Sequence, residues 1–303
     1  MDQHLLVFVT VVEKGSFSRA AEELHMTQPA VSQYIKLLEQ THGGKLLERS
    51  NKYVRLNKAG EIVYYHAKEI LGLYTKMQSL LDDLANRANG PLSIGASYTF
   101  GEYVLPHFIA KLHEQFPLIK PSIVIGNSKE IAELVVGHQL DVGIIEGDFK
   151  NAHLSIDAFA EDTMFVVASS HHHLLQQERE VKMSELEEET WIIRELGSGT
   201  RAATEKVFQK MSIAPKDIME FGSTQLIKES VESGLGITFL SHLAIRKEVS
   251  MGLLTIVPIK GTPLKRKFSI VLRNSFKTKA LEVFIELLKE HPTFSTVMKR
   301  TQK

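Results

Sequence analysis

Three short segments of the chain carry residue types that bind anions, and each stands immediately before a predicted helix. They are Ser97-Tyr98-Thr99-Phe100, Asn127-Ser128 and Gly197-Ser198-Gly199-Thr200-Arg201. Serine and threonine hydroxyls and the free backbone N–H groups that begin a helix donate hydrogen bonds to anions, and an arginine adds positive charge. We therefore expect a site for a carboxylate, sulfate or phosphate, lined by Ser97, Thr99, Phe100, Asn127, Ser128, Ser198, Gly199, Thr200 and Arg201.

Several residues leave alternatives open at this site. Arg194 is an alternative source of positive charge, and Thr224, before a later helix, is an additional candidate. Glu146 ends a predicted strand and could instead select an amine. Ser198 and Thr200 could also serve only as helix caps, because hydroxyl side chains commonly accept hydrogen bonds from the first N–H groups of a helix.

The motifs of the common enzyme and metal-binding classes are not found. The sequence has no cysteine, which excludes disulfides, thiolate nucleophiles and cysteine metal ligands. It has no Walker A segment, no H-E-x-x-H pair and no G-x-S-x-G elbow, and Gly234-Leu235-Gly236 lacks the third glycine of a dinucleotide fingerprint. Three adjacent histidines at 171–173 are interpreted as a surface loop. We therefore expect no catalytic residues, no metal and no cofactor, but a small-molecule ligand.

The elements that position these residues alternate between strand and helix. Strands are predicted at 92–96, 122–125, 142–145, 164–168, 191–193, 219–221, 237–240, 254–257 and 268–272. Helices are predicted near 101–115, 129–138, 200–210, 225–233, 242–249 and 278–290. This alternation predicts an α/β domain with a largely parallel sheet. A length of about 210 residues suits two lobes, which we place at about 90–162 with 268–303, and at 163–267.

The beginning of the chain predicts a different, mainly helical domain. Apolar residues follow the helical period over about residues 2–14. A second helix capped by Ser16 or Ser18 and a third capped by Thr27 follow, with only two residues between these two helices. Two short helices joined by so tight a turn form a helix-turn-helix. Residues 46–56 then predict two short strands around a polar turn, which is a β-wing.

A fourth helix, capped by Asn57 and running to about residue 88, carries a heptad pattern. Spacings of 3, 4, 3, 4, 3 and 4 separate its members, which are Val63, His66, Ile70, Leu73, Met77, Leu80 and Leu84. Such a seam is typical of a helix that pairs with a second copy, and the alternative is an amphipathic helix packed on its own domain. We predict dimerisation through this helix. Asn89-Gly90-Pro91 ends it, which gives domains at 1–58, 59–89 and 90–303.

The overall composition is that of an ordinary globular protein with about two domains. The 36 Lys+Arg balance the 36 Asp+Glu, which taken alone argues against a nucleic-acid ligand. The balance hides a local excess, because residues 45–58 hold Lys45, Arg49, Lys52, Arg55 and Lys58 against Glu48 alone. The first residues lack the basic start and cleavage site of a secretory signal, and no apolar run reaches the roughly 18 residues of a membrane span. We therefore expect a cytoplasmic location.

Two stretches carry a family resemblance, namely GSFSRAAEEL (15–24) and TQPAVSQYIKLLE (27–39). They resemble the DNA-binding segment of LysR-type transcriptional regulators, and the resemblance extends over the full length. It implies an α+β protein with an N-terminal winged helix-turn-helix, a long linker helix and a two-lobed α/β effector domain similar to periplasmic binding proteins. The chain departs from the family pattern at Gln33, commonly Arg, at Leu46-Leu47, usually Leu-Phe, and at Leu56-Asn57, usually Leu-Thr.

The resemblance assigns DNA contacts to the third helix and the wing. The first residues of a recognition helix enter the major groove, where glutamine can pair with adenine and an Ala or Pro surface suits the thymine methyl. Lysine and the wing cations suit phosphates or the minor groove. The predicted contacts are Gln28, Pro29, Ala30, Ser32, Gln33, Lys36, Arg49, Lys52 and Arg55. Any single one of them could instead be a solvated surface side chain.

We interpret the chain as a ligand-responsive, DNA-binding transcriptional regulator and not as an enzyme. The resemblance implies double-stranded DNA, RNA polymerase and a small anionic metabolite as partners, with a homodimer through the linker helices and a homotetramer. No membrane partner is expected. Residues 194–201, RELGSGTR, resemble versions found in regulators of sulfur assimilation and carbon fixation. The alternatives are a cytoplasmic solute-binding protein and an α/β enzyme, and a footprint on promoter DNA would exclude both.

Overall fold

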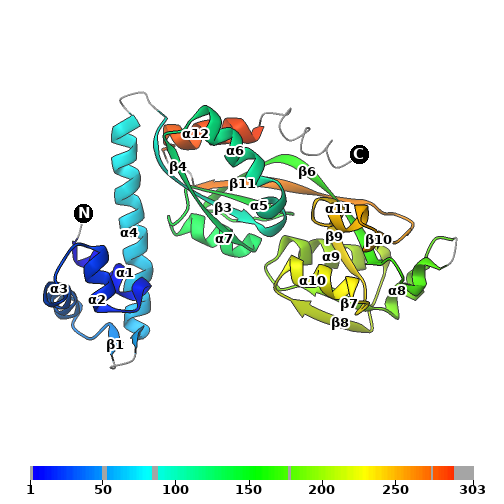
Figure 1. The fold of residues 1–303 in the computed structure, drawn as a ribbon, viewed down its shortest axis with the longest axis horizontal. Coiled ribbons are helices and arrows are strands. Elements are labelled where there is room, and N and C mark those ends of the chain that lie inside the picture. Colours follow the sequence, from blue (N-terminus) through cyan, green and yellow to red (C-terminus); the bar gives the residue numbers. More distant parts are fainter. Residues whose placement is uncertain (1–2, 50–52, 84–87, 177–178, 274–275, 290–303) are drawn as a thin grey trace. The chain divides into compact units, whose positions relative to one another are not determined.

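The computed structural model describes residues 3–49, 53–83, 88–176, 179–273 and 276–289. The chain divides into two compact units, one formed by Met1–Ala85 with Gly137–Gln139 and the other by Asn86–Val136 and Leu140–Lys303 (Figure 1). Each unit has a hydrophobic core of its own. No helix in the described ranges combines the length and the apolarity that a membrane crossing requires.

Three short helices begin the first unit, namely α1 (Gln3–Lys14), α2 (Phe17–Glu23) and α3 (Gln28–Thr41). The Ser16 hydroxyl accepts a hydrogen bond from the Arg19 N–H, and the Thr27 hydroxyl accepts one from the Ala30 N–H. These caps satisfy backbone donors that a helix start leaves free. His25 adopts a left-handed conformation, with φ of 52°, in the turn between α2 and α3. The predicted helix-turn-helix is confirmed.

The core of this unit is formed by the apolar stripes of the helices. Phe8 of α1 and Val31 and Ile35 of α3 are fully buried and pack together. The chain then forms a two-stranded antiparallel wing, β1 (Leu47–Arg49) and β2 (Val54–Leu56), in which Leu47 pairs with Leu56. Leu47 turns its side chain into the same core, and this burial anchors the wing to the helices.

The long helix α4 (Lys58–Asp83) follows the wing. The Asn57 side-chain oxygen accepts a hydrogen bond from the Gly60 N–H at 2.8 Å, as its predicted capping role requires. Gly60 also needs its hydrogen side chain, because a Cβ there would lie 2.0 Å from the Leu46 carbonyl oxygen. Farther along α4, the seam residues Ile70 and Leu73 leave about half of their surface exposed.

A seven-stranded sheet organises the second unit. Its strands are β3 (Gly90–Ser97), β4 (Ile119–Gly126), β5 (Val142–Glu146), β6 (Leu154–Ser169), β9 (Thr238–Ser241), β10 (Leu254–Ile256) and β11 (Leu264–Arg273). They lie in the order β10-β6-β11-β5-β3-β4, and β9 pairs with β6. A separate parallel pair is formed by β7 (Thr190–Arg194) and β8 (Asp217–Phe221).

Two lobes are built on these strands (Figure 1). The first lobe packs α5 (Tyr98–Tyr103), α6 (Leu105–Gln115), α7 (Ser128–Val136) and α12 (Lys279–Lys289) on β3, β4 and β5. The second lobe combines β7 to β10 with the 3-10 turn η1 (His173–Leu175) and with α8 (Met183–Glu187), α9 (Gly199–Met211), α10 (Thr224–Glu232) and α11 (His242–Ser250). The long strand β6 belongs to both lobes, because its first part pairs with β11 and its last part pairs with β9 and β10.

The second unit differs from the sequence prediction in two respects. The expected largely parallel sheet is mixed, because β6 and β11 pair antiparallel with each other and with their described neighbours β5, β9 and β10. The single helix expected near 101–115 is two helices that meet at Val104. Pro106 lies in the first turn of the second helix, where its missing N–H does no harm, whereas it would interrupt a continuous helix.

Candidate functional site

A buried cluster of charged side chains lies where the two lobes meet the strands β6 and β11. The Arg266 guanidinium forms ion pairs with the Glu146 Oε2 at 2.6 Å and with the Asp162 Oδ2 at 2.7 Å. All three side chains are almost completely buried. The second oxygen of Asp162 accepts a hydrogen bond from the Ser241 hydroxyl at 2.6 Å. One arginine thus joins the end of β5 to β6, from its position on β11.

The Glu146 carboxylate uses the donors of the first predicted anion-binding segment. Its Oε1 accepts hydrogen bonds from the Ser97 hydroxyl at 2.8 Å, the Thr99 N–H at 2.9 Å and the Phe100 N–H at 3.3 Å. The Ser128 hydroxyl accepts from the backbone N–H of Glu146 and donates to its carbonyl oxygen. The predicted residues therefore do come together, but they surround a carboxylate that belongs to the protein itself.

The second lobe reaches the same carboxylate through the start of α9. The Thr200 hydroxyl lies 3.5 Å from the Glu146 Oε2 and 3.0 Å from the Arg266 Nη1. Arg266 also donates to the Thr99 hydroxyl of the first lobe at 2.9 Å. Gly199 permits this approach, because a Cβ at that position would lie 2.4 Å from the Glu146 carbonyl oxygen. The contact between the lobes thus depends on a glycine, a threonine and one shared guanidinium.

Two members of this cluster, Asp162 and Arg266, have pKa values shifted from their ordinary range. Burial raises the pKa of Asp162, and this effect exceeds the opposing effect of the neighbouring Arg266. Burial alone would lower the pKa of Arg266, but the carboxylates of Glu146 and Asp162 raise it above its ordinary value. Two carboxylates share one guanidinium, so the cluster carries a net negative charge when all three groups are ionised.

A second polar cluster lies between the lobes beside the first. The buried Arg194 at the end of β7 pairs with Glu195 at 2.6 Å, donates to the Thr224 hydroxyl at 3.0 Å and stacks over the Tyr98 ring. The Asn127 side-chain amide donates to Glu195 at 3.3 Å. Burial opposes the ionisation of Glu195, yet the hydrogen bonds and charge of Arg194 lower its pKa below the ordinary value. The sequence offered Arg201 and Arg194 as sources of positive charge for the site. Of these two, Arg194 is the one that contacts the opposite lobe.

Arg201 takes a different direction. Its guanidinium pairs with Glu205 at 2.7 Å and Glu220 at 2.9 Å, and it donates to the Arg194 carbonyl oxygen. The structure therefore does not bring Arg201 together with the Glu146 carboxylate. Ser198 caps α9 by accepting a hydrogen bond from the Thr200 N–H at 3.2 Å, which is the capping alternative that the sequence left open.

The histidines of the predicted surface loop form a cluster with a glutamate. His172 Nε2 and His173 Nε2 lie 3.4 Å and 2.8 Å from the two carboxylate oxygens of Glu189. The imidazole rings are stacked 4.5 Å apart with 29° between their planes. One ligand atom from each of the two histidines and from Glu189 lies within 4.8 Å of the others, a spacing that a metal ion could bridge. Burial lowers the pKa of His172. The His172 side chain is largely buried, whereas His171 and His173 are exposed.

The predicted nucleic-acid contacts lie on α3 and the wing of the first unit. Gln28, Pro29, Gln33 and Lys36 are exposed along α3, whereas Val31, Ile35 and Leu38 on its other side are buried. Ala30 and Ser32 are half-buried, and the Ser32 hydroxyl accepts a hydrogen bond from the Gln28 amide. On the wing, Arg55 is exposed and stacks over the Tyr53 ring at 4.9 Å. Lys52 and the side chain of Arg49 lie outside the described residues.

Family comparisons agree with both units. Residues 3–61 match the family described as bacterial regulatory helix-turn-helix protein, lysR family, and residues 85–293 match the LysR substrate binding domain. The chain belongs to the LysR family of transcriptional regulators. The predicted family, the predicted fold class and the prediction of a DNA-binding regulator with a ligand-binding domain are therefore confirmed.

Individual relatives of this LysR-type regulator are named for transcriptional control. The chain is 36% identical to the HTH-type transcriptional regulator CysL of Bacillus subtilis over 95% of its length and 96% of that protein. It is 35% identical to the RuBisCO operon transcriptional regulator of Acidithiobacillus ferrooxidans over 94% of this chain and 92% of that one. The CcmR regulatory domain of Synechocystis PCC6803, solved in complex with 2-PG, is 25% identical with a TM-score of 0.61, covering 66% of this chain and 96% of that domain.

Two central residues of the regulator's buried cluster were missed from the sequence. Arg266 stands between Lys265 and Lys267, and the three cations together resemble a solvated charge run. The signal that could have found it is the alternation of a strand, because residue 266 shares its face with the buried Phe268 and Ile270. Asp162 lay just before the strand predicted to begin at residue 164, so it carried no positional signal.

We predict that replacing Arg266 by Met strongly destabilises the second unit. The substitution leaves the buried carboxylates of Glu146 and Asp162 without their counter-ion, which costs about 3–5 kcal/mol of unfolding free energy. Urea denaturation followed by the fluorescence of Trp191, the sole tryptophan, measures this loss. The double variant Arg266→Met with Glu146→Gln should recover part of it, because one of the two stranded charges is removed. A single variant as stable as the parent protein would contradict a structural role for the cluster.

Proposed function

We propose that this LysR-type regulator binds promoter DNA as an oligomer and that a small anionic metabolite changes its arrangement on DNA. The observation that carries the proposal is the pairing of an exposed helix-turn-helix face with a two-lobed domain whose lobes meet at a buried polar cluster. A ligand that favours one lobe arrangement shifts the population of conformers, and the linker helix can transmit that shift to the DNA-binding units.

The DNA contacts divide into base-reading and phosphate-binding groups. Gln28, Gln33 and Pro29 are exposed near the start of α3, where a recognition helix meets base edges. Arg55 and Lys36 present exposed charges to the sugar-phosphate backbone. The side chains on the opposite side of α3 build the core, so the two faces of this helix have separate roles.

We predict that Arg55→Ala weakens DNA binding and flattens its dependence on salt. Each lost phosphate contact reduces the slope of log K against log salt by roughly one unit per protomer. Fluorescence anisotropy with a DNA sequence selected from a random pool, and with an unrelated duplex, measures both quantities between 50 and about 200 mM salt. Lys247→Ala, which removes an exposed cation of the second unit, serves as the matched control. An unchanged slope for Arg55→Ala would remove the wing from the interface.

The apolar seam of α4 supports pairing between two copies of the chain. Ile70, Leu73 and Met77 follow the 4-residue and 3-residue heptad steps, and each exposes nearly half of its surface. His66, the polar seam member, is exposed and pairs with Glu69 at 2.9 Å. Leu84 lies outside the described residues. An exposed apolar stripe of this length favours a helix–helix dimer over a free surface, and a homotetramer through further contacts remains our proposal.

We predict that Leu73→Lys shifts the protein toward monomer. A charge in the middle of the seam must be desolvated or expelled when two helices pair, so the dimer dissociation constant should rise at least about tenfold, or roughly 1.4 kcal/mol. Sedimentation velocity over a concentration series measures this constant. Thr75→Lys places the same charge on another exposed face of α4 and should leave it unchanged. Equal behaviour of the two variants would argue against the seam.

The effector is proposed to compete with the carboxylate of Glu146. Ser97, Thr99 and Thr200 direct their polar groups to this side chain, which holds the position expected for an anionic ligand. An incoming anion therefore gains these donors when Glu146 moves away. The relatives named for RuBisCO operon control and the 2-PG complex of CcmR support a small anionic metabolite as the class to test. If Glu146 instead selects an amine, which is the alternative that the sequence left open, removal of its charge should weaken ligand binding.

We predict that Glu146→Gln tightens the binding of an anionic effector by about tenfold, because the amide removes the competing negative charge and its repulsion. Isothermal titration with 2-PG and with sulfate, compared with an amine of similar size, tests the sign. Glu133→Gln, at an exposed position of α7, is the control and should have no effect. Weaker anion binding in Glu146→Gln would instead make Glu146 a direct partner of a cationic ligand.

The remaining partners follow from the same proposal. A promoter-bound regulator of this family is expected to contact RNA polymerase and to work in the cytoplasm, where its DNA is found. The site holds a ligand through hydroxyl, amide and guanidinium groups, and we propose that it releases that ligand unchanged and is not an enzyme. Turnover of a bound metabolite would contradict this.

A further inference from the structure

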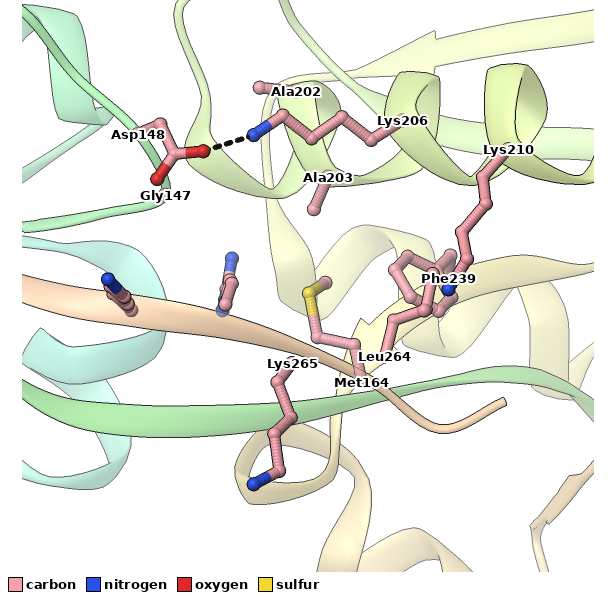
Figure 2. A pocket seen from close by; sticks show the side chains of 12 residues that line it. Gly147, Asp148, Met164, Ala202, Ala203, Lys206, Lys210, Phe239, Leu264 and Lys265 are labelled. Carbon is pink, nitrogen blue, oxygen red and sulfur yellow. Dashed lines mark hydrogen bonds and ion pairs between the residues drawn. The ribbon is translucent and has the colours of Figure 1, made fainter. Parts of the chain in front are cut away.

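A pocket of about 420 Å³ lies in the second unit, and the predicted effector residues do not line it. It is formed between α9, the strand β11 and the loop that follows β5 (Figure 2). Its apolar floor includes the buried side chains of Met164 and Phe239, together with Leu264. The small side chains of Ala202 and Ala203 leave space beside α9. A volume of this size accommodates a small organic molecule.

The rim of this pocket is strongly positive. Four lysines line it, namely Lys206, Lys210, Lys265 and Lys267, against the single carboxylate of Asp148. Lys206 pairs with Asp148 at 2.5 Å, and Lys265 pairs with Glu161 at 2.8 Å. Figure 2 shows Lys206 directed at Asp148, and Lys210 extending beside Phe239. Among the described residues, no carboxylate forms a salt bridge with Lys210 or Lys267, so two ammonium groups are left for a ligand.

We infer that this lysine-lined pocket binds a small organic dianion with a short carbon body. Its anionic group would lie among Lys206, Lys210 and Lys267, where it displaces Asp148 from Lys206. Its carbon body would cover the apolar floor at Met164 and Phe239. This pocket differs from the buried cluster around Glu146 in its charge balance. In the cluster, the donors already bind the protein's own carboxylate, whereas the lysine-lined pocket has more cations than carboxylates.

The pocket is connected to the site between the lobes by two elements. Arg266 lines the pocket and also carries the guanidinium that holds Glu146 and Asp162. Helix α9 carries Thr200 in the buried cluster and, farther along, Lys206 and Lys210 at the pocket. A ligand that draws α9 and β11 together therefore favours the arrangement in which the lobes meet. This second site goes beyond the proposed function, since it requires neither DNA nor a ligand at Glu146.

The test is isothermal titration of the full-length protein, without DNA, with phenyl phosphate, inorganic phosphate and phenol at constant ionic strength. Phenyl phosphate should bind most tightly, inorganic phosphate more weakly and phenol not measurably, because both the charge and the apolar body contribute. The double variant Lys206→Gln with Lys210→Gln should weaken phenyl phosphate binding by about tenfold, the combined effect of two exposed charge contacts. Asp148→Asn should strengthen it, because the competing carboxylate is removed.

Matched variants distinguish binding in this pocket from general attraction of anions to surface lysines. Lys216 is an exposed lysine that pairs with Glu188 at 2.5 Å, as Lys206 does with Asp148, and Lys247 is exposed in the last turn of α11. The double variant Lys216→Gln with Lys247→Gln should bind like the parent protein. Ala202→Phe should abolish binding by filling the pocket, with thermal unfolding unchanged.

Two results would overturn the inference. One is equal weakening by the two lysine pairs, which indicates general charge attraction. The other is phenyl phosphate binding that Thr200→Val weakens and that the double variant Lys206→Gln with Lys210→Gln leaves unchanged. That result would place the ligand at the site between the lobes. Neither result bears on the DNA contacts of the first unit, so a failure here is distinguishable from a failure of the proposed function.

Discussion

The ion pairs of Arg266 with Glu146 and Asp162 are the interaction on which the ligand-binding unit depends. They join three strands that come from distant parts of the sequence, and they lie where water cannot solvate the charges. Buried ion pairs contribute little net stability compared with apolar packing, yet the loss of one partner is costly. The cluster therefore fixes which side chains face each other between the lobes, and Thr99 and Thr200 take their positions from it.

The DNA-binding unit depends on simpler forces. Each helix of the helix-turn-helix has an apolar side that reaches one core and a hydroxyl side chain that caps its start. The same regularity leaves a continuous polar face on α3, with its glutamines exposed. Zero net charge for the whole chain does not argue against DNA contacts by this unit, because residues 45–58, which include the wing, hold a local basic excess. The charge that matters for a partner is the local one.

The local elements of the fold could be predicted where one pattern dominates. Thr27, Ser16 and Asn57 cap the helices that their spacing predicted, because capping depends on neighbours a few residues away. The antiparallel pairing of β6 with β11 could not be predicted, since it joins segments about a hundred residues apart. Arg266 was hidden in a run of cations. Strand alternation places it on the buried face of β11, apart from Lys265 and Lys267, but its pairing with Glu146 and Asp162 is a tertiary contact that no local pattern predicts. The predicted hydroxyl groups do converge, but no sequence pattern could indicate that Glu146 occupies their centre.

The long strand β6 has a mechanical consequence. Its 16 residues extend for about 50 Å, and hydrogen bonds tie its first part to β11 and its last part to β9 and β10. The lobes therefore cannot separate as two bodies on a slack tether. The lobes can rotate relative to each other only by twisting β6 and β11, because the hydrogen bonds between these two strands resist their separation. The two lobes thus share one continuous sheet, and any rearrangement between them must be accommodated where β6 and β11 pass from one lobe to the other.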